Sequence, residues 1–149
     1  MHRHVYLVED HPVLRGAYTS LIDASDDLRV VGSAASAADA LAGLATLDVD
    51  VAIVDVSLGG PRGTAHGIDL VGALHRRWPA LRMLVVSGHD ETLYAERAMR
   101  AGARGYLMKH EASWSLLAAL RHVLDGDVVL SDRMSARLPA ALRTSVAAL

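Results

Sequence analysis

Short apolar runs that alternate with stretches of helical spacing constrain the fold of this chain more than any other feature. The runs occupy residues 4–8, 28–32, 51–54, 83–86 and 106–108. A run that is apolar at every position, such as 51–54, is typical of a parallel strand covered by helices on both faces. Because strand–helix–strand connections are right-handed, the repeats predict a three-layer α/β fold: a doubly wound, five-stranded parallel sheet with five helices.

Capping residues and helix breakers mark the ends of the predicted helices. Pro12 begins the first helix, whose predicted apolar stripe consists of Val13, Leu14, Ala17, Leu21 and Ile22. The second helix is predicted to start at Ser36, the third to stop at Pro79 and the fourth to end at Gly102. The fifth is predicted to run from a Ser113 cap to Gly126.

The composition excludes several classes of function. The 149 residues carry 15 Lys and Arg against 17 Asp and Glu, so binding of nucleic acid over the whole surface is disfavoured. Without cysteine, disulfides, thiolate catalysis and cysteine-ligated zinc are excluded. No apolar run approaches the roughly 18 residues of a membrane span, and the first residues do not resemble a signal peptide. We therefore expect a cytoplasmic protein without a membrane partner.

The length fits one domain with a tail. We expect a compact domain over residues 1–126 and a C-terminal extension over 127–149. Within the extension, Ser131 is predicted to cap a short helix that ends at Leu138, before Pro139. The residues that follow are typical of an interdomain linker, which favours a truncated chain over the alternative of a natural single-domain protein.

Polar residues stand where four of the predicted strands end. They are Glu9, Asp10, Asp55, Ser87 and Lys109. Ligands of such sheets bind at the carboxyl ends of the strands, so these side chains should meet at one edge. Two carboxylates about 4 Å apart repel by roughly 1 kcal/mol in water and about 4 kcal/mol at an effective dielectric of 20. Either one carboxylate keeps a proton or a cation binds, and oxygen ligands favour Mg²⁺.

Magnesium normally accompanies phosphate chemistry, which gives each of these residues a candidate task. Asp55 follows the central apolar run and is the best placed nucleophile, since a carboxylate can attack phosphorus to give an aspartyl phosphate. Ser87 and Lys109 then suit the remaining phosphoryl oxygens, one as a hydroxyl and the other as a point charge.

As a set, these residues resemble the receiver domain of two-component response regulators, in the NarL/FixJ subgroup that carries a LuxR-type helix-turn-helix. The subgroup resemblance rests on the segments Val8-Glu9-Asp10-His11-Pro12-Val13-Leu14-Arg15-Gly16, Ala101-Gly102-Ala103-Arg104-Gly105-Tyr106-Leu107-Met108-Lys109 and Val129-Leu130-Ser131. It covers about residues 4–138 and implies a flavodoxin-like, CheY-like sheet of strand order 2-1-3-4-5. It also implies a phosphorylation switch rather than a turnover enzyme, controlling transcription through a DNA-binding domain for which this length leaves no room.

The resemblance implies a role for each site residue. Asp55 would accept a phosphoryl group from a phosphohistidine of a sensor histidine kinase. Asp10, Asp55 and the main-chain carbonyl of Ser57 would bind Mg²⁺, with Glu9 acting through metal-bound water. The phosphoryl oxygens would contact Ser87 and Lys109, and Tyr106 would move inward as Ser87 follows the phosphoryl group. Ser57 and His89 would tune the lifetime of the phosphoryl group.

The loop after Asp55 departs from the family pattern. Gly59 stands where the family usually has proline, and the glycine-rich stretch 59–67 is longer than the pattern allows. No Gly-Lys-Ser/Thr follows it, so we interpret the stretch as a surface insertion rather than a phosphate-binding loop. His110 is a second departure, because many receivers have proline directly after the lysine.

Two other interpretations stay open. An aspartyl-phosphate phosphatase usually carries a second acid two residues after its nucleophile, where this chain has Ser57. A pseudo-receiver would act purely as a protein-interaction module, but it usually lacks the acceptor or the acidic pair. The resemblance further implies a homodimer strengthened by phosphorylation. The end of the last helix, Arg121-His122-Val123-Leu124, and an apolar strip of Leu130, Met134 and Leu138 are the predicted surface for it. The alternative is that the strip packs back on its own sheet, which is favoured for Leu130.

Overall fold

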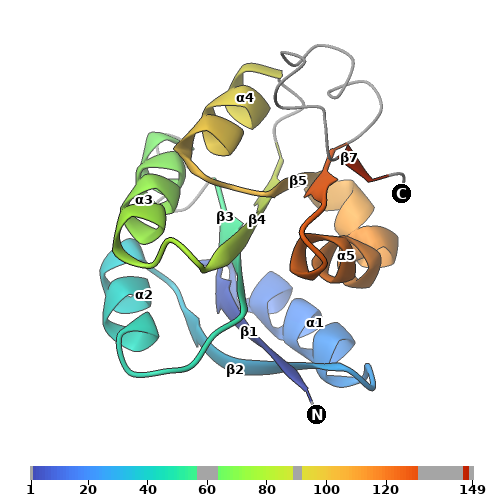
Figure 1. Cartoon of the computed structure of the whole chain (residues 1–149). Coiled ribbons are helices and arrows are strands. Elements are labelled where there is room, and N and C mark those ends of the chain that lie inside the picture. The colour runs from blue at the N-terminus through green and yellow to red at the C-terminus, as the bar shows by residue number, and fades with distance from the viewer. Residues whose placement is uncertain (1, 57–63, 89–91, 131–145, 148–149) are drawn as a thin grey trace.

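The computed structural model describes residues 2–56, 64–88, 92–130 and 146–147 (Figure 1). Along these residues the elements are β1 (Arg3–Val8), α1 (Pro12–Asp23), β2 (Leu28–Ala34), α2 (Ala37–Leu44), β3 (Val51–Asp55), α3 (Thr64–Arg77), β4 (Arg82–Ser87), α4 (Thr92–Ala101), β5 (Gly105–Met108), α5 (Lys109–Leu124), β6 (Val128–Val129) and β7 (Val146–Ala147). All strands pair in parallel in one sheet of order β2-β1-β3-β4-β5-β6-β7. The predicted fold class and the order 2-1-3-4-5 are confirmed.

The short strands β6 and β7 extend the sheet beyond the five predicted strands. Val129 pairs with Gly105 of β5, and both residues of β6 are β-branched, which suits a strand. Leu130 is 2% exposed and packs back on the sheet of its own chain. The first residues after position 126 therefore belong to the core. The short helix predicted from Ser131 lies outside the described residues.

Helices cover both faces of the sheet, with α1 and α5 on one side and α2, α3 and α4 on the other (Figure 1). Because strand side chains alternate between faces, the strands contribute residues to two separate apolar clusters, one on each face of the sheet. Facing α1 and α5 are Val5, Leu7, Val51, Ile53, Leu84, Val86 and Leu107. Facing the other helices are Tyr6, Val8, Ala52, Val54, Met83, Val85 and Tyr106. Full burial of one large apolar side chain contributes about 1.5–3 kcal/mol, so both clusters stabilise the sheet.

Most predicted helix ends are confirmed, but the start of the last helix is wrong. The Ser36 hydroxyl accepts the Asp39 N–H at 3.1 Å, and Gly102 adopts a φ of 124° directly after α4. However, α5 begins at Lys109 rather than after a Ser113 cap. The Glu111 carboxylate accepts the Met108 N–H at 3.1 Å, which caps the chain as it leaves β5. Strand and helix are therefore continuous at Lys109.

The apolar stripe predicted for α1 is also partly wrong. Val13 is 72% exposed and Ala17 is exposed, whereas Tyr18 and Ile22 are buried. Leu14 and Leu21 pack partly against the same cluster. The buried face thus consists of Leu14, Tyr18, Leu21 and Ile22. The sequence prediction considered only apolar residues and so left out Tyr18.

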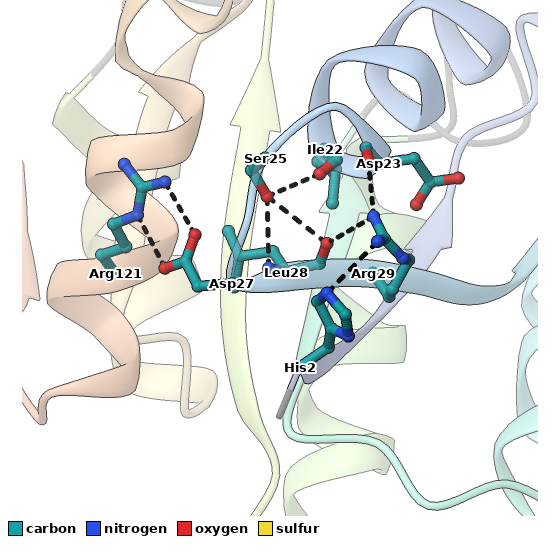
Figure 2. A network of polar contacts seen from close by, with 8 residues as sticks. All are labelled: His2, Ile22, Asp23, Ser25, Asp27, Leu28, Arg29 and Arg121. Carbon is teal, nitrogen blue, oxygen red and sulfur yellow. Dashed lines mark hydrogen bonds and ion pairs between the residues drawn. The ribbon is translucent and has the colours of Figure 1, made fainter.

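An ion pair joins α5 to the loop between α1 and β2 at the amino-terminal edge of the sheet (Figure 2). The Arg121 guanidinium donates to both Asp27 carboxylate oxygens, at 2.9 and 2.8 Å. Beside it, the Ser25 hydroxyl donates to the Ile22 carbonyl at 2.7 Å and accepts the Leu28 N–H at 3.2 Å. Within the part of the chain described, no helix is both long and apolar enough to cross a membrane.

Candidate functional site

Strand register brings Glu9 and Asp55 together at the carboxyl edge of the sheet. Leu7 of β1 pairs with Ile53 of β3, and two residues later the same row reaches Glu9 and Asp55. The Glu9 N–H continues the ladder by donating to the Ala34 carbonyl at 3.0 Å. Both side chains are 1% exposed and lie on the face covered by α1 and α5.

Lys109 connects this pair from the end of β5. Its ammonium Nζ lies 3.2 Å from Asp55 Oδ2 and 3.8 Å from Glu9 Oε1. Asp10, which is exposed, completes a group of three carboxylates whose oxygens lie within 4.8 Å of one another. The structure therefore brings together four of the predicted site residues, which arise from three strand ends.

Main-chain contacts fix the orientation of Glu9. Its carboxylate oxygen Oε1 accepts the His11 N–H at 3.2 Å. Its carbonyl accepts the guanidinium of Arg15 at 2.8 Å, which holds the start of α1 against the end of β1. His11 itself caps α1, since its Nδ1 accepts the Leu14 N–H at 3.4 Å.

Burial and the neighbouring carboxylate raise the pKa of Glu9 to about 7. The largest cause is the loss of hydration, followed by the negative charge of Asp55 and a hydrogen bond between the two carboxyl groups. Lys109 and the His11 N–H act in the opposite direction. Near neutral pH the pair thus holds a proton that a cation could replace, and its oxygen-only donors fit Mg²⁺.

Ser87 and Tyr106 lie on the opposite face of the sheet from Lys109. Ser87 is fully buried at the end of β4, in the row of Val85, and Val85 pairs with Tyr106. The Tyr106 side chain is 1% exposed, so its ring already lies inward in this structure. Ser57 and His89, the predicted lifetime-tuning positions, lie outside the described residues.

Gly67 is a structural determinant of the site that the sequence prediction treated as part of a surface loop. That prediction is wrong at its carboxyl end, because α3 begins at Thr64 and contains Gly67. A Cβ on Gly67 would lie 2.6 Å from both Cα and O of Val56, and 2.9 Å from O of Asp55. Only glycine lets α3 approach the backbone that follows the candidate acceptor. The twelve-residue spacing from Asp55 gave no signal of this contact.

Comparison with known proteins agrees with this architecture. The response regulator receiver domain family matches residues 5–121. The activator DevR/DosR of Mycobacterium tuberculosis is 38% identical over 93% of this chain, and the nitrate/nitrite regulator NarL of Escherichia coli is 32% identical over 95%. The chain spans 62% and 63% of the lengths of these two relatives.

The same class emerges from structural comparison. A LuxR-family two-component response regulator from Aurantimonas sp. SI85-9A1 superposes with a TM-score of 0.82 at 29% identity, covering 91% of this chain and 94% of that one. The fold and the acidic edge define a signalling domain of two-component systems. The chain belongs to the response regulator receiver domain family, and its relatives are transcriptional regulators of the LuxR type.

Proposed function

We propose that this receiver domain is a phosphorylation switch in which Asp55 accepts a phosphoryl group from a phosphohistidine of a sensor histidine kinase. The observation that carries the proposal is the position of Asp55, buried beside Lys109 and within reach of two further carboxylates. The reaction forms a bond between an Asp55 carboxylate oxygen and phosphorus. It breaks the phosphorus–nitrogen bond, whose electron pair stays with the imidazole of the donor.

The residues around Asp55 favour this transfer electrostatically. Glu9, Asp10 and Asp55, with the main-chain carbonyl of Ser57, would hold Mg²⁺, which neutralises the oxygens of an approaching phosphoryl group when bound. Lys109 already contacts the acceptor carboxylate, and its charge can stabilise the phosphoryl oxygens once Asp55 carries the acyl phosphate. Ser87, from the neighbouring strand, would donate its hydroxyl to another phosphoryl oxygen.

Switching would follow from the two faces that the site occupies. Lys109 acts from the side of α1 and α5, whereas Ser87 and Tyr106 share the side of α4. Movement of Ser87 toward the phosphoryl group would therefore alter the packing around Tyr106 and α4. Self-catalysed phosphorylation and dephosphorylation are the only chemistry we propose for the domain itself.

The surface around the site offers two exposed apolar residues to a kinase. Val13, in the first turn of α1, is 72% exposed, and Trp114, in the second turn of α5, is 70% exposed. Both helices begin at the edge of the sheet that carries Asp55. A domain that delivers a phosphoryl group to Asp55 must contact this edge, so we assign the two residues to its docking surface.

Three residues of the surface predicted for the dimer, Val123, Leu124 and Leu130, are buried in the core of their own chain. Met134 and Leu138 lie outside the described residues, so for them the strip stays a prediction. We propose that phosphorylation strengthens a homodimer, and that any contact with DNA is made by an output domain rather than by the receiver domain. Sedimentation with and without beryllofluoride tests the dimer, and a monomer in both states at high concentration would refute it.

Intact-mass measurement after incubation with acetyl phosphate and Mg²⁺ tests the proposed chemistry. Wild type should gain one phosphoryl group, and Asp55→Asn should gain none. Asp48→Asn, a change in the loop before β3, is the matched control and should behave as wild type. A wild-type chain that binds Mg²⁺ but takes no phosphoryl group would favour a pseudo-receiver, and rapid turnover of the donor without limit would favour a phosphatase.

A further inference from the structure

The hydroxyl of Tyr18 has no hydrogen-bond partner although it is buried. Among the side chains that the structure describes, it is the one buried polar atom in this condition, and the residue as a whole is 5% exposed. Buried polar groups are nearly always paired, because a lost partner leaves the cost of dehydration uncompensated. Phenylalanine would fill the same space without this cost, so the hydroxyl calls for an explanation.

The position of Tyr18 places it in the same layer as the acidic site. Tyr18 projects from the second turn of α1 into the cluster formed with Leu7 and Ile53. These two strand residues are followed, on the same face, by Glu9 and Asp55. Burial raises the pKa of Tyr18 to about 12, and the negative charges of Glu9 and then Asp55 act in the same direction.

Glu9 is the carboxylate with capacity to accept a hydrogen bond. The Lys109 ammonium faces both carboxylates, at 3.2 Å from Asp55 Oδ2 and 3.8 Å from Glu9 Oε1, and Glu9 Oε1 also accepts the His11 N–H. A carboxylate offers about four lone-pair positions, which is more than these contacts use, so Glu9 can still accept a donor. A tyrosine hydroxyl is a good donor at this place, because it adds no charge to a site that must balance three carboxylates.

We propose that Tyr18 is a positioning residue of the acidic site, whose hydroxyl donates to the Glu9 carboxylate when a divalent cation holds the site. This inference rests on the proposed function, since it assigns Mg²⁺ to the three carboxylates. In this structure the Tyr18 hydroxyl is buried and unpaired. The cost of the unpaired hydroxyl is then recovered on binding, so Tyr18 contributes to the affinity for the cation rather than to the stability of the empty domain.

Tyr18→Phe separates the two effects, because it removes one oxygen and keeps the ring. Mg²⁺ alone is titrated by calorimetry into wild type and variant, and the thermal midpoint is measured in chelator and in excess Mg²⁺. We expect the variant to bind Mg²⁺ about 10-fold more weakly, the lower end of what loss of an outer-shell partner causes. In chelator its midpoint should equal or exceed that of wild type, and Mg²⁺ should raise it by less.

Tyr6→Phe is the matched control. Tyr6 is equally buried on β1, but it lies on the opposite face of the sheet, where its hydroxyl is next to Gly43 of α2. This variant should bind Mg²⁺ as wild type does. A Tyr18→Phe variant with wild-type Mg²⁺ affinity, or one that loses thermal stability equally with and without Mg²⁺, would overturn the inference. If wild type itself bound no Mg²⁺, the proposed metal site would fail, which is a distinct outcome.

Discussion

The ammonium of Lys109 lies 3.2 Å from the carboxylate of Asp55, although 54 residues separate them in the chain. The carboxylate side chain is 1% exposed and the lysine 27%, so the pair is largely withdrawn from water. In such surroundings an ion pair is strongly coupled to whatever changes the charge of either partner. Phosphorylation of Asp55 would change both the charge and the length of the acceptor side chain. Lys109, the first residue of α5, would have to adjust to that change.

Replacing Lys109 should uncouple phosphorylation from the conformational response. In Lys109→Ala the phosphoryl mimic loses a contact that favours the active state. We expect the coupling free energy between binding of the mimic and the conformational change to fall by about 1–3 kcal/mol. The measurement is the change in amide chemical shifts on saturation with beryllofluoride and Mg²⁺. Arg100→Ala serves as the control, since Arg100 pairs with Glu96 on the surface of α4. A full wild-type response in Lys109→Ala would contradict this role.

The raised pKa of Glu9 predicts a specific pH dependence of stability in chelator. The folded carboxyl titrates at about 7 and the unfolded one at 4.5. Between these values the unfolded state releases a proton that the folded state keeps, so stability falls as pH rises through about 7. The shift corresponds to a contribution on the order of 3 kcal/mol, fully present below pH 4.5 and lost above pH 7.

Urea unfolding at several pH values between 5 and 8 measures this contribution. Because other groups titrate as well, the relevant quantity is the difference between wild type and Glu9→Gln. Stability of the variant should fall less than that of wild type over this range. Parallel curves for the two proteins would show that Glu9 titrates normally in the folded state.

Gly67→Ala should destabilise the domain and weaken the site. The added Cβ would meet main-chain atoms of Val56 at 2.6 Å, which cannot give way as a flexible side chain can. We expect a loss of about 1–3 kcal/mol in urea unfolding, as for other overpacked positions. Gly16→Ala is the matched control: Gly16 lies in α1 with nothing within 4 Å of a new Cβ, so this change should stabilise by roughly 0.5–1 kcal/mol. Equal effects of the two changes would contradict the close approach.

The Arg121–Asp27 ion pair should contribute little to stability despite its good geometry (Figure 2). Both side chains are nearly half exposed, at 47% and 48%, and exposed pairs contribute about 0.2–1 kcal/mol. A double-mutant cycle with Arg121→Gln and Asp27→Asn measures the coupling directly. A coupling above 2 kcal/mol would show that the pair clamps α5 to the loop before β2.

The sequence predicts the sheet and its acidic edge well because both depend on local patterns. Continuous apolar runs such as 51–54 are typical of strands covered on both faces, and the residue after each such strand lies at the carboxyl edge of the sheet. Glu9, Asp55 and Lys109 were predicted on this basis alone, and the structure brings them within hydrogen-bonding or ion-pair distance.

Features that depend on tertiary contacts were less accessible. The cap supplied by Glu111 places Lys109 at the start of α5, whereas Ser113 carries the stronger sequence signal. The predicted stripe left out Tyr18 because tyrosine carries a polar hydroxyl, although its ring is apolar and packs in the core. The constraint on Gly67 comes from the backbone of Val56, which is distant in sequence and invisible to any helical pattern.

Peptide mapping of the phosphorylated chain tests the central claim most directly. Wild type treated with acetyl phosphate and Mg²⁺ is reduced with borohydride to trap an acyl phosphate, then digested and sequenced by tandem mass spectrometry. The account predicts a modified residue at Asp55 alone, absent from Asp55→Asn and from a sample treated with excess chelator. A phosphoryl group on another carboxylate, or one retained in Asp55→Asn, would contradict the assignment of Asp55 as the acceptor.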